Sequence, residues 1–404
     1  QNQVMKKILI LLAALPLLLS SCMDLTGENP YEADLQMFSF RLALPAPYSG
    51  RDLTGVEVVV TNVNDNSSYT ALCDASGSVS LRLPSGLYMV SVSADIDGLH
   101  FNASKSGIVL SGGEVPVELP LKESRSGDIV IKEIYCGGCM KLPQEGTYQS
   151  DSYIILHNNT DHTVYLDSLC FGTLDPYNSN SATVWEEDIE FSPVIQAVWQ
   201  FPGDGKSFPL EKGQDAILSI MGAIDHTAQY PLSVNLNRSD VFACYSPTYF
   251  PNTSYHPAPG DKVQRDRYMN VVIKTGQSNA YTFSINSPAV VIFRAEGQTI
   301  QEFVSGSDNV IYKPGSSKDK VVCVPNEWVI DGVEVFNGQS SANKKRMNSS
   351  IDASYVTLSN VHEGRTLMRK VNESRSAELG YEVLMDTNNS GNDFYERESQ
   401  SIKE

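Results

Sequence analysis

Short runs in which apolar and polar residues alternate dominate the chain from residue 35 onward, and they predict β-strands. In residues 35–123 these runs are 37–44, 56–61, 78–83, 87–94 and 115–121. A period of two arises because successive side chains of a strand point to opposite faces. Turn signals rich in Gly, Asp and Pro separate the runs, and no helical period interrupts them. We therefore expect a small β-sandwich here.

The same pattern of short strand-like runs and turn residues continues through residues 128–404, after a short polar hinge. Strand-like runs at 129–135, 151–159 and 163–167 open this region, and two longer aromatic segments, 177–201 and 245–268, interrupt it. Gly, Pro, Asn, Ser and Tyr recur every few positions, which is typical of secreted β-proteins. The predicted fold class is all-β, with a larger sandwich that carries long insertions following the small one.

A different pattern stands at the amino end. Lys6 and Lys7 precede an unbroken apolar run of 12 residues, 8–19, which leads directly into Leu-Ser-Ser-Cys22. The run is shorter than the roughly 18 residues of a spanning helix, so it indicates a cleaved export signal. We interpret residues 1–21 as a lipoprotein signal peptide, Cys22 as the lipidated residue and 22–34 as a tether. The lipid would hold the chain at a membrane.

The net charge of the chain limits the classes of partner that it can bind. The formal net charge is −18, and the one basic cluster is the triplet at 344–346. Nucleic-acid phosphates require a basic face, so we expect no nucleic-acid partner.

Six cysteines follow Cys22, and two of them, Cys136 and Cys139, are close in sequence. They follow a strand-like run rather than opening a helix, which disfavours redox catalysis. A zinc site would need a second close pair, which the sequence lacks. We expect Cys136 and Cys139 to form a local disulfide or to remain free thiols. The other cysteines are Cys73, Cys170, Cys244 and Cys323.

Sequence motifs that indicate a catalytic site are weak throughout the chain. Residues 203–207 resemble the end of a phosphate-binding loop, but Gln200 stands where its first glycine is required. His157 and His162 are read as solvated turn residues rather than metal ligands. We predict no catalytic residue, no enzyme activity, no metal site and no cofactor. Calcium is the alternative that carboxylate pairs such as Asp386 and Asp393 leave open.

The aromatic segments hold the candidate ligand-binding residues. Aromatic faces beside amides and carboxylates suit sugars, peptides or other small solutes. Trp199 lies in an apolar run and is expected in the core. The predicted ligand-binding residues are Tyr177, Trp185, Tyr249 and Tyr255.

Residues 35–123 resemble the carboxypeptidase regulatory, transthyretin-like sandwich. The resemblance rests on an Asp-x-x-Gly turn at 74–77 and on Leu-Pro-x-Gly-x-Tyr at 83–88. It implies a spacer or docking module without an active site.

Residues 128–404 resemble the lamin-tail fold, which is Ig-like. The matching segments are a Tyr-Ile-x-Leu strand at 153–156, Gly-x-x-Leu at 364–367 and Asp-Thr-Asn-Asn-Ser at 386–390. Ile155 departs from the family, which usually has glutamate there.

Together these segments resemble a Bacteroidota family of outer-membrane lipoproteins of unassigned function. Members tend to be encoded beside TonB-dependent receptors, which implies a non-catalytic binding or accessory subunit of an uptake system, facing the cell exterior. An adhesin or structural spacer is the alternative, and a surface hydrolase is the third. A TonB-dependent receptor is the implied protein partner.

Overall fold

The computed structural model describes residues 35–111, 116–338 and 340–403. It confirms the all-β prediction, because strands far outnumber helices among these residues. The predicted signal peptide, lipidated Cys22 and tether lie outside the described residues. None of the helices within them is long and apolar enough to cross a membrane.

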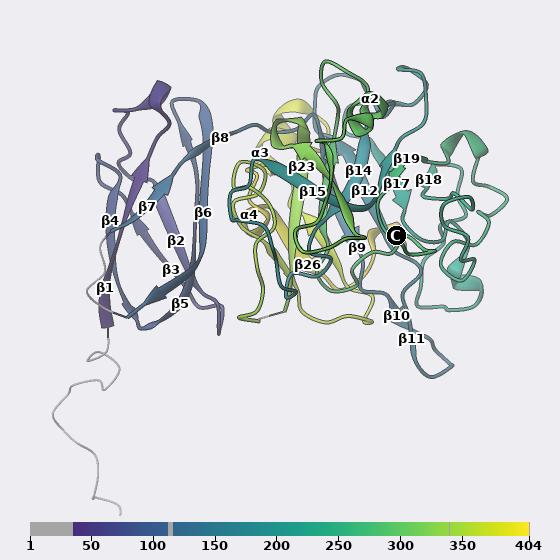
Figure 1. The fold of residues 1–404 in the computed structure, drawn as a ribbon, viewed down its shortest axis with the longest axis horizontal. Coiled ribbons are helices and arrows are strands. Elements are labelled where there is room, and N and C mark those ends of the chain that lie inside the picture. Colours follow the sequence, from purple (N-terminus) through teal and green to yellow (C-terminus); the bar gives the residue numbers. More distant parts are fainter. Residues whose placement is uncertain (1–34, 112–115, 339, 404) are drawn as a thin grey trace, which may run out of the picture.

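The first eight strands form a small two-sheet sandwich (Figure 1). One sheet has the order β4 (Ser78–Pro84), β1 (Leu35–Ala43) and β7 (Val117–Pro120); the other has the order β3 (Ser68–Leu72), β2 (Glu57–Asn62), β5 (Gly86–Ile96), β6 (Leu99–Leu110) and β8 (Lys122–Ser124). Alternate residues of β1, such as Phe38, Phe40 and Leu42, are buried between the sheets. The sequence pattern missed β3 and β6. β3 has no buried residue, so it carries no apolar stripe.

The remaining strands form a larger sandwich of two main sheets. The six-stranded sheet has the order β18 (Val241–Ala243), β17 (Asp215–Ser219), β12 (Tyr153–Asn158), β9 (Ile129–Tyr135), β25 (Thr366–Arg369) and β26 (Phe394–Arg397). The eight-stranded sheet has the order β21 (Val310–Tyr312), β22 (Lys320–Pro325), β15 (Phe191–Gln200), β14 (Cys170–Leu174), β20 (Ala289–Phe293), β23 (Val329–Asn337) and β24 (Val356–Leu358), with β19 (Asn270–Lys274) paired to β15.

Short elements complete this domain. They are the pairs β10 (Cys139–Met140) with β11 (Thr147–Tyr148) and β13 (Val164–Tyr165) with β16 (Pro209–Leu210), the helices α2 (Ile300–Ser305), α3 (Glu373–Leu379) and α4 (Ser390–Asp393), and single 3₁₀ turns at His226–Ala228, Arg265–Arg267, Asn326–Trp328 and Ser401–Lys403. A further 3₁₀ turn, Ala46–Tyr48, lies in the small sandwich.

The main core lies between the two large sheets. Ile154 and Leu218 enter it from one sheet, and Trp199 and Ile292 from the other. Trp199 is fully buried, which confirms its expected place in the core. The segment around it is not an insertion, as the sequence suggested. It forms β15, which pairs with β14, β19 and β22 and so belongs to the sheet itself.

Candidate functional site

A cavity of about 380 Å³ lies where several loops of the larger domain meet. We call it the tyrosine cavity, and its lining residues are Gln149, Tyr177, Asn178, Met221, Tyr255, Thr282, Phe283, Ile285 and Asn286. Its volume falls within the range of small-molecule sites, roughly 300–1,000 Å³. The structure thus brings together two of the predicted ligand-binding residues, Tyr177 and Tyr255, from segments far apart in sequence.

Gln196 anchors one wall of this cavity to the sheet. It stands at an irregularity of β15 with φ of 64°, a conformation that non-glycine residues rarely adopt. Its Nε2 donates to the carbonyl of Thr282 (2.9 Å), and the N–H of Thr282 donates to its Oε1 (3.1 Å). Tyr177 then donates its hydroxyl to Thr282 Oγ1 (3.1 Å). A strand bulge of this kind re-aims a side chain, and here it fixes Thr282 and Tyr177.

A buried histidine holds the loop that carries Tyr255. His256 Nε2 lies 2.8 Å from the carbonyl oxygen of Tyr281, the neighbour of Thr282. Burial lowers the pKa of His256, so the imidazole is neutral near pH 7. Tyr255 itself is half-buried and packs against the main core. Adjacent residues of one loop therefore serve different purposes, since His256 fixes the backbone and Tyr255 faces the cavity.

The amides of the cavity are held in a defined orientation. Ser284 Oγ donates to Asn178 Oδ1 (2.7 Å), and Ser287 Oγ donates to Asn286 Oδ1 (2.9 Å). Among the described residues, neither Nδ2 group has a partner, and the side chain of Gln149 has none. Burial raises the pKa of Tyr177, so its phenol is uncharged. The cavity therefore offers neutral hydrogen-bonding groups around an apolar floor of Met221, Phe283 and Ile285.

The other two predicted ligand-binding residues lie elsewhere. Trp185 donates from Nε1 to Asp175 Oδ2 (2.9 Å) and meets Phe191 edge to face. Tyr249 is 41% exposed, and its carbonyl accepts from Lys274 Nζ. Neither lines the tyrosine cavity. Each of the two aromatic segments therefore contributes one residue to the cavity and one residue that lies outside it.

Cys136 and Cys139 are free thiols, which is one of the two states expected for this pair. Cys136 is buried in the main core, while Cys139 Sγ faces Asp151 Oδ2 at 3.8 Å. The thiols thus occupy different environments on either side of a turn at Gly138, where φ is 70°. Burial raises the pKa of Cys136 to about 12 and that of Cys139 to about 11, which disfavours the thiolate that metal binding and redox chemistry require.

One group of potential metal ligands occurs within the described residues: His157, Asp215 and Glu382. His157 is buried on β12, so its assignment to a solvated turn was wrong; its Nδ1 lies 2.6 Å from Asp215 Oδ1. Lys132 Nζ donates to Asp215 (2.7 Å) and to Glu382 (2.5 Å). Burial alone would lower the pKa of Lys132. The carboxylates of Asp215 and Glu382 have the larger combined effect, so the pKa is raised. The ammonium already supplies the positive charge that a metal ion would bring.

The loop that resembles a phosphate-binding motif binds a carboxylate of the chain itself. The N–H groups of Gly205, Ser207 and Phe208 donate to Asp167 at 2.8–2.9 Å. A Cβ on Gly203 would lie 2.0 Å from Asp167 Oδ1, so this position requires glycine. The backbone donors that could hold a phosphate are therefore occupied.

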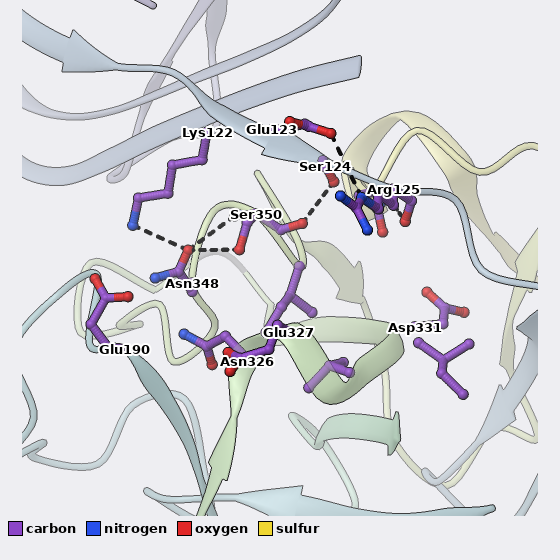
Figure 2. A pocket seen from close by; sticks show the side chains of 14 residues that line it. Lys122, Glu123, Ser124, Arg125, Glu190, Asn326, Glu327, Asp331, Asn348 and Ser350 are labelled. Atoms are coloured by element: carbon purple, nitrogen blue, oxygen red, sulfur yellow. Dashed lines mark hydrogen bonds and ion pairs between the residues drawn. The ribbon is translucent and has the colours of Figure 1, made fainter. Parts of the chain in front are cut away.

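A second cavity, of about 390 Å³, lies between the two sandwiches (Figure 2). We call it the junction cavity. Lys122 Nζ lies 3.1 Å from Asp188 Oδ1 and donates to Asn348 Oδ1 (3.2 Å), and Ser124 Oγ donates to the carbonyl of Ser350 (2.7 Å). Glu187 accepts hydrogen bonds from Ser106 N and Oγ. These contacts join the small sandwich to the large one.

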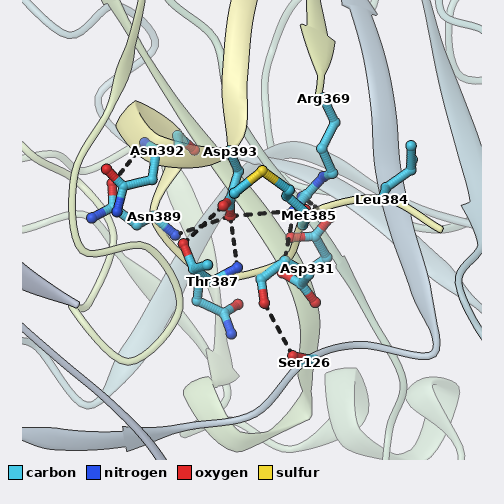
Figure 3. A network of polar contacts seen from close by, with 12 residues as sticks. Ser126, Asp331, Arg369, Leu384, Met385, Thr387, Asn389, Asn392 and Asp393 are labelled. Carbon is cyan, nitrogen blue, oxygen red and sulfur yellow. Dashed lines mark hydrogen bonds and ion pairs between the residues drawn. The ribbon is translucent and has the colours of Figure 1, made fainter. Parts of the chain in front are cut away.

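Beside it, a buried network surrounds Arg369 (Figure 3). Its guanidinium meets Asp331 at 2.6 Å, Asp386 at 3.2 Å and Asp393 at 3.6 Å. Arg369 Nε also donates to the carbonyl of Ile131 (2.8 Å). The carboxylates considered for calcium, Asp386 and Asp393, thus converge on a guanidinium. We call these four charged residues the Arg369 network.

The segment between Asp386 and Asp393 faces the small sandwich with its backbone. His100 Nε2 lies 2.7 Å from the carbonyl oxygen of Thr387, and Asn102 Nδ2 donates to the carbonyls of Thr387 (3.2 Å) and Asn388 (3.1 Å). Asn388 Nδ2 donates back to the carbonyl of Arg125 (3.0 Å). This segment is therefore the joint between the two domains.

Sequence reasoning missed several residues that line the tyrosine cavity, notably Gln149, Thr282 and Asn286, and also Gln196, which holds Thr282 in place. The polar character of Gln149 and Asn286 gives no signal in the sequence, because similar residues occur in loops throughout the chain. The positive φ of Gln196 also leaves no trace in the sequence.

Comparison with known proteins shows that part of the chain is similar to a protein family. Residues 211–401 match the sequence model of a family described as "Protein of unknown function (DUF4876)". This range includes Tyr255 and residues 282–286 but not Gln149 or Tyr177. A comparison with curated proteins found no match.

Among solved structures, the chain is similar to the crystal structure of a DUF4876 family protein from Bacteroides thetaiotaomicron. The TM-score is 0.57 with 24% sequence identity, and the likeness covers 89% of this chain and 94% of that one. At this identity the likeness concerns the fold. Both findings agree with the expected Bacteroidota family of unassigned function, while the carboxypeptidase regulatory and lamin-tail resemblances remain predictions. Residues 211–401 thus carry a region that is similar to the DUF4876 family, whose function is unknown.

Proposed function

We propose that the protein is a lipid-anchored, non-catalytic binding subunit of the outer membrane that captures a small solute in the tyrosine cavity. The observation that carries this proposal is a set of neutral polar groups that have no hydrogen-bond partner among the described residues, the side chain of Gln149, Asn178 Nδ2 and Asn286 Nδ2, beside the apolar side chains of the lining. These residues are half-buried and line a cavity, so their amides are available to hydrogen-bond a ligand there.

The lining also favours binding over catalysis. Its nine residues include no carboxylate, histidine, cysteine, serine or lysine, so the hydroxyls of Thr282, Tyr177 and Tyr255 have no basic group in the lining to activate them. A TonB-dependent receptor remains the proposed partner, on the strength of the sequence resemblance.

A thermal-shift screen of the detergent-solubilised full chain tests the binding role. The screen uses neutral, anionic and cationic solutes, with Tyr255→Ala and Tyr177→Ala as cavity variants and Tyr249→Ala as the control. We expect a solute that stabilises wild type and the control but not the cavity variants. A ligand that stabilises all four proteins equally would place binding outside the cavity and contradict the proposal.

The anchor has its own test. A clickable palmitate analogue should label the wild-type protein in cells and leave Cys22→Ala unlabelled, with both expressed at equal levels. Protease treatment of intact cells should cleave the protein if it faces outward. Full protection would place it on the periplasmic side and favour the structural-spacer alternative, which the extensive joint between the two sandwiches also suits.

A further inference from the structure

The tyrosine cavity is free of charge in a strongly acidic protein. None of its nine lining residues is Lys, Arg, Asp, Glu or His, although the chain carries a net charge of −18. The tyrosine phenols are its one titratable type, and burial raises the pKa of Tyr177 further above its ordinary value. The cavity therefore presents the same neutral surface at every physiological pH.

A charged ligand would enter this cavity without a counter-charge. Moving an ionised group out of water is costly unless an opposite charge or several well-placed hydrogen bonds replace its hydration. The overall negative charge would further oppose an anion. The cost of dehydrating a charged group and the repulsion of anions disfavour binding of anionic sugars, amino acids and peptides with free termini.

A purely apolar ligand fits no better. It would cover the amides of Gln149, Asn178 and Asn286 and leave them without hydrogen bonds, which costs free energy for each group. The ligand must therefore carry several uncharged donors and acceptors while offering an apolar face to Met221, Phe283 and the tyrosine rings.

An extended, uncharged peptide is the remaining competitor, and the position of the lining residues argues against it. Peptides of that kind usually pair with the open edge of a strand through a ladder of backbone hydrogen bonds. All nine lining residues lie in loops outside the strands, so the cavity presents no such edge.

We propose that the tyrosine cavity binds an uncharged carbohydrate of mono- or disaccharide size, whose hydroxyls pair with the free amides and whose ring face packs on Tyr177 and Tyr255. This proposal rests on the binding function above and names its ligand class. Sugar hydroxyls both donate and accept, and their C–H faces pack on aromatic rings, so they match both kinds of surface in the cavity.

Calorimetric titration of the full chain in detergent tests the ligand class. The probes are the neutral disaccharides maltose, cellobiose, mannobiose and diacetylchitobiose, the anionic digalacturonate, and the capped dipeptide N-acetyl-alanyl-alanine amide. We expect at least one neutral disaccharide to bind, with digalacturonate at least tenfold weaker. Tyr255→Ala should weaken the disaccharide at least tenfold, and Tyr249→Ala should leave it unchanged. Far-UV and near-UV circular dichroism would verify that both variants fold.

A charge added to the cavity sharpens the test. Gln149→Arg supplies the missing counter-charge, so it should raise the affinity for digalacturonate relative to the wild type. Tyr255-dependent binding of digalacturonate or of the capped dipeptide, without binding of any neutral disaccharide, would overturn the carbohydrate class and leave the binding function standing. If no probe binds in a Tyr255-dependent way, both proposals fail.

Discussion

The tyrosine cavity and the junction cavity are nearly equal in volume, about 380 and 390 Å³, yet the polar groups around them are arranged in opposite ways. At the junction, Lys122, Ser124 and Asn348 bond to one another or to neighbours across the two sandwiches. In the tyrosine cavity, Asn178 Nδ2 and Asn286 Nδ2 have no hydrogen-bond partner among the described residues. Size alone therefore does not separate a binding site from a structural gap. The two cavities differ in charge, since Lys122, Glu190 and Glu327 are among the residues that line the junction cavity and no charged residue lines the tyrosine cavity.

Removing the charge at the centre of the joint should give the largest effect. Arg369→Met leaves the buried carboxylates of Asp331, Asp386 and Asp393 without their counter-charge, and we expect a loss of about 3–5 kcal/mol in unfolding free energy. Urea denaturation measures the loss. The matched control is Arg238→Met, which breaks an exposed pair with Asp240 and should cost less than about 1 kcal/mol. Similar losses for both variants would show that the network does not hold the joint.

A pair of amide truncations compares the two regions directly. Asn102→Ala removes two hydrogen bonds to the carbonyls of Thr387 and Asn388, which keep His100 and the N–H of Ala353 as partners, so it should cost about 1–3 kcal/mol. Gln149→Ala removes a side chain that makes no hydrogen bond within the described protein, and its effect should stay within about 0.5 kcal/mol. Thermal and urea unfolding provide the measurement. A loss at Gln149 as large as that at Asn102 would erase the distinction between the cavities.

The joint should respond to pH, whereas the tyrosine cavity should not. Asp352, which accepts from Glu334 N and Ser390 N, has its pKa raised by burial from 3.8 to about 6. The folded state therefore binds this proton more tightly than the unfolded state, and stability should decline as pH rises from about 4 to about 6. The difference in unfolding free energy between wild type and Asp352→Asn should change across that window. A difference that stays constant from pH 4 to 7 would contradict the raised pKa.

The smallest expected effect is the labelling of two thiols in the segment that leads to Gln149. Its thiols, Cys136 and Cys139, are held by packing, and their raised pKa values should keep them unreactive. In native protein at pH 8 we expect no labelling by iodoacetamide, and in urea without reductant we expect labelling of both. Peptide mass spectrometry distinguishes the two sites. Labelling in urea that appears only after reduction would restore the disulfide.

Alternating apolar residues were sufficient to predict the all-β class and strands such as β9, because β-pairing follows from local pattern and burial. The same pattern placed Trp199 in the core. It could not place His157, whose partner Asp215 is far along the chain, nor assign β3, which has no buried residue. The sequence predicted only part of the tyrosine cavity, namely Tyr177 and Tyr255, because aromatic residues in loops are recognisable candidates for ligand binding. Its amide side chains could not be predicted as binding groups, because long-range packing brings them together around the cavity.

The pairing of β1 has a mechanical consequence. If the amino terminus is anchored as proposed, a force from flow or from a receptor enters at Leu35 and leaves through β8 toward the larger domain. β1 runs parallel to β7, from Phe40 opposite Val117 to Ala43 opposite Pro120. The loaded ends of these two strands therefore lie at opposite ends of the pair, so tension shears their hydrogen bonds together instead of peeling them one at a time. The small sandwich then acts as a force-bearing link that holds the distal domain under load.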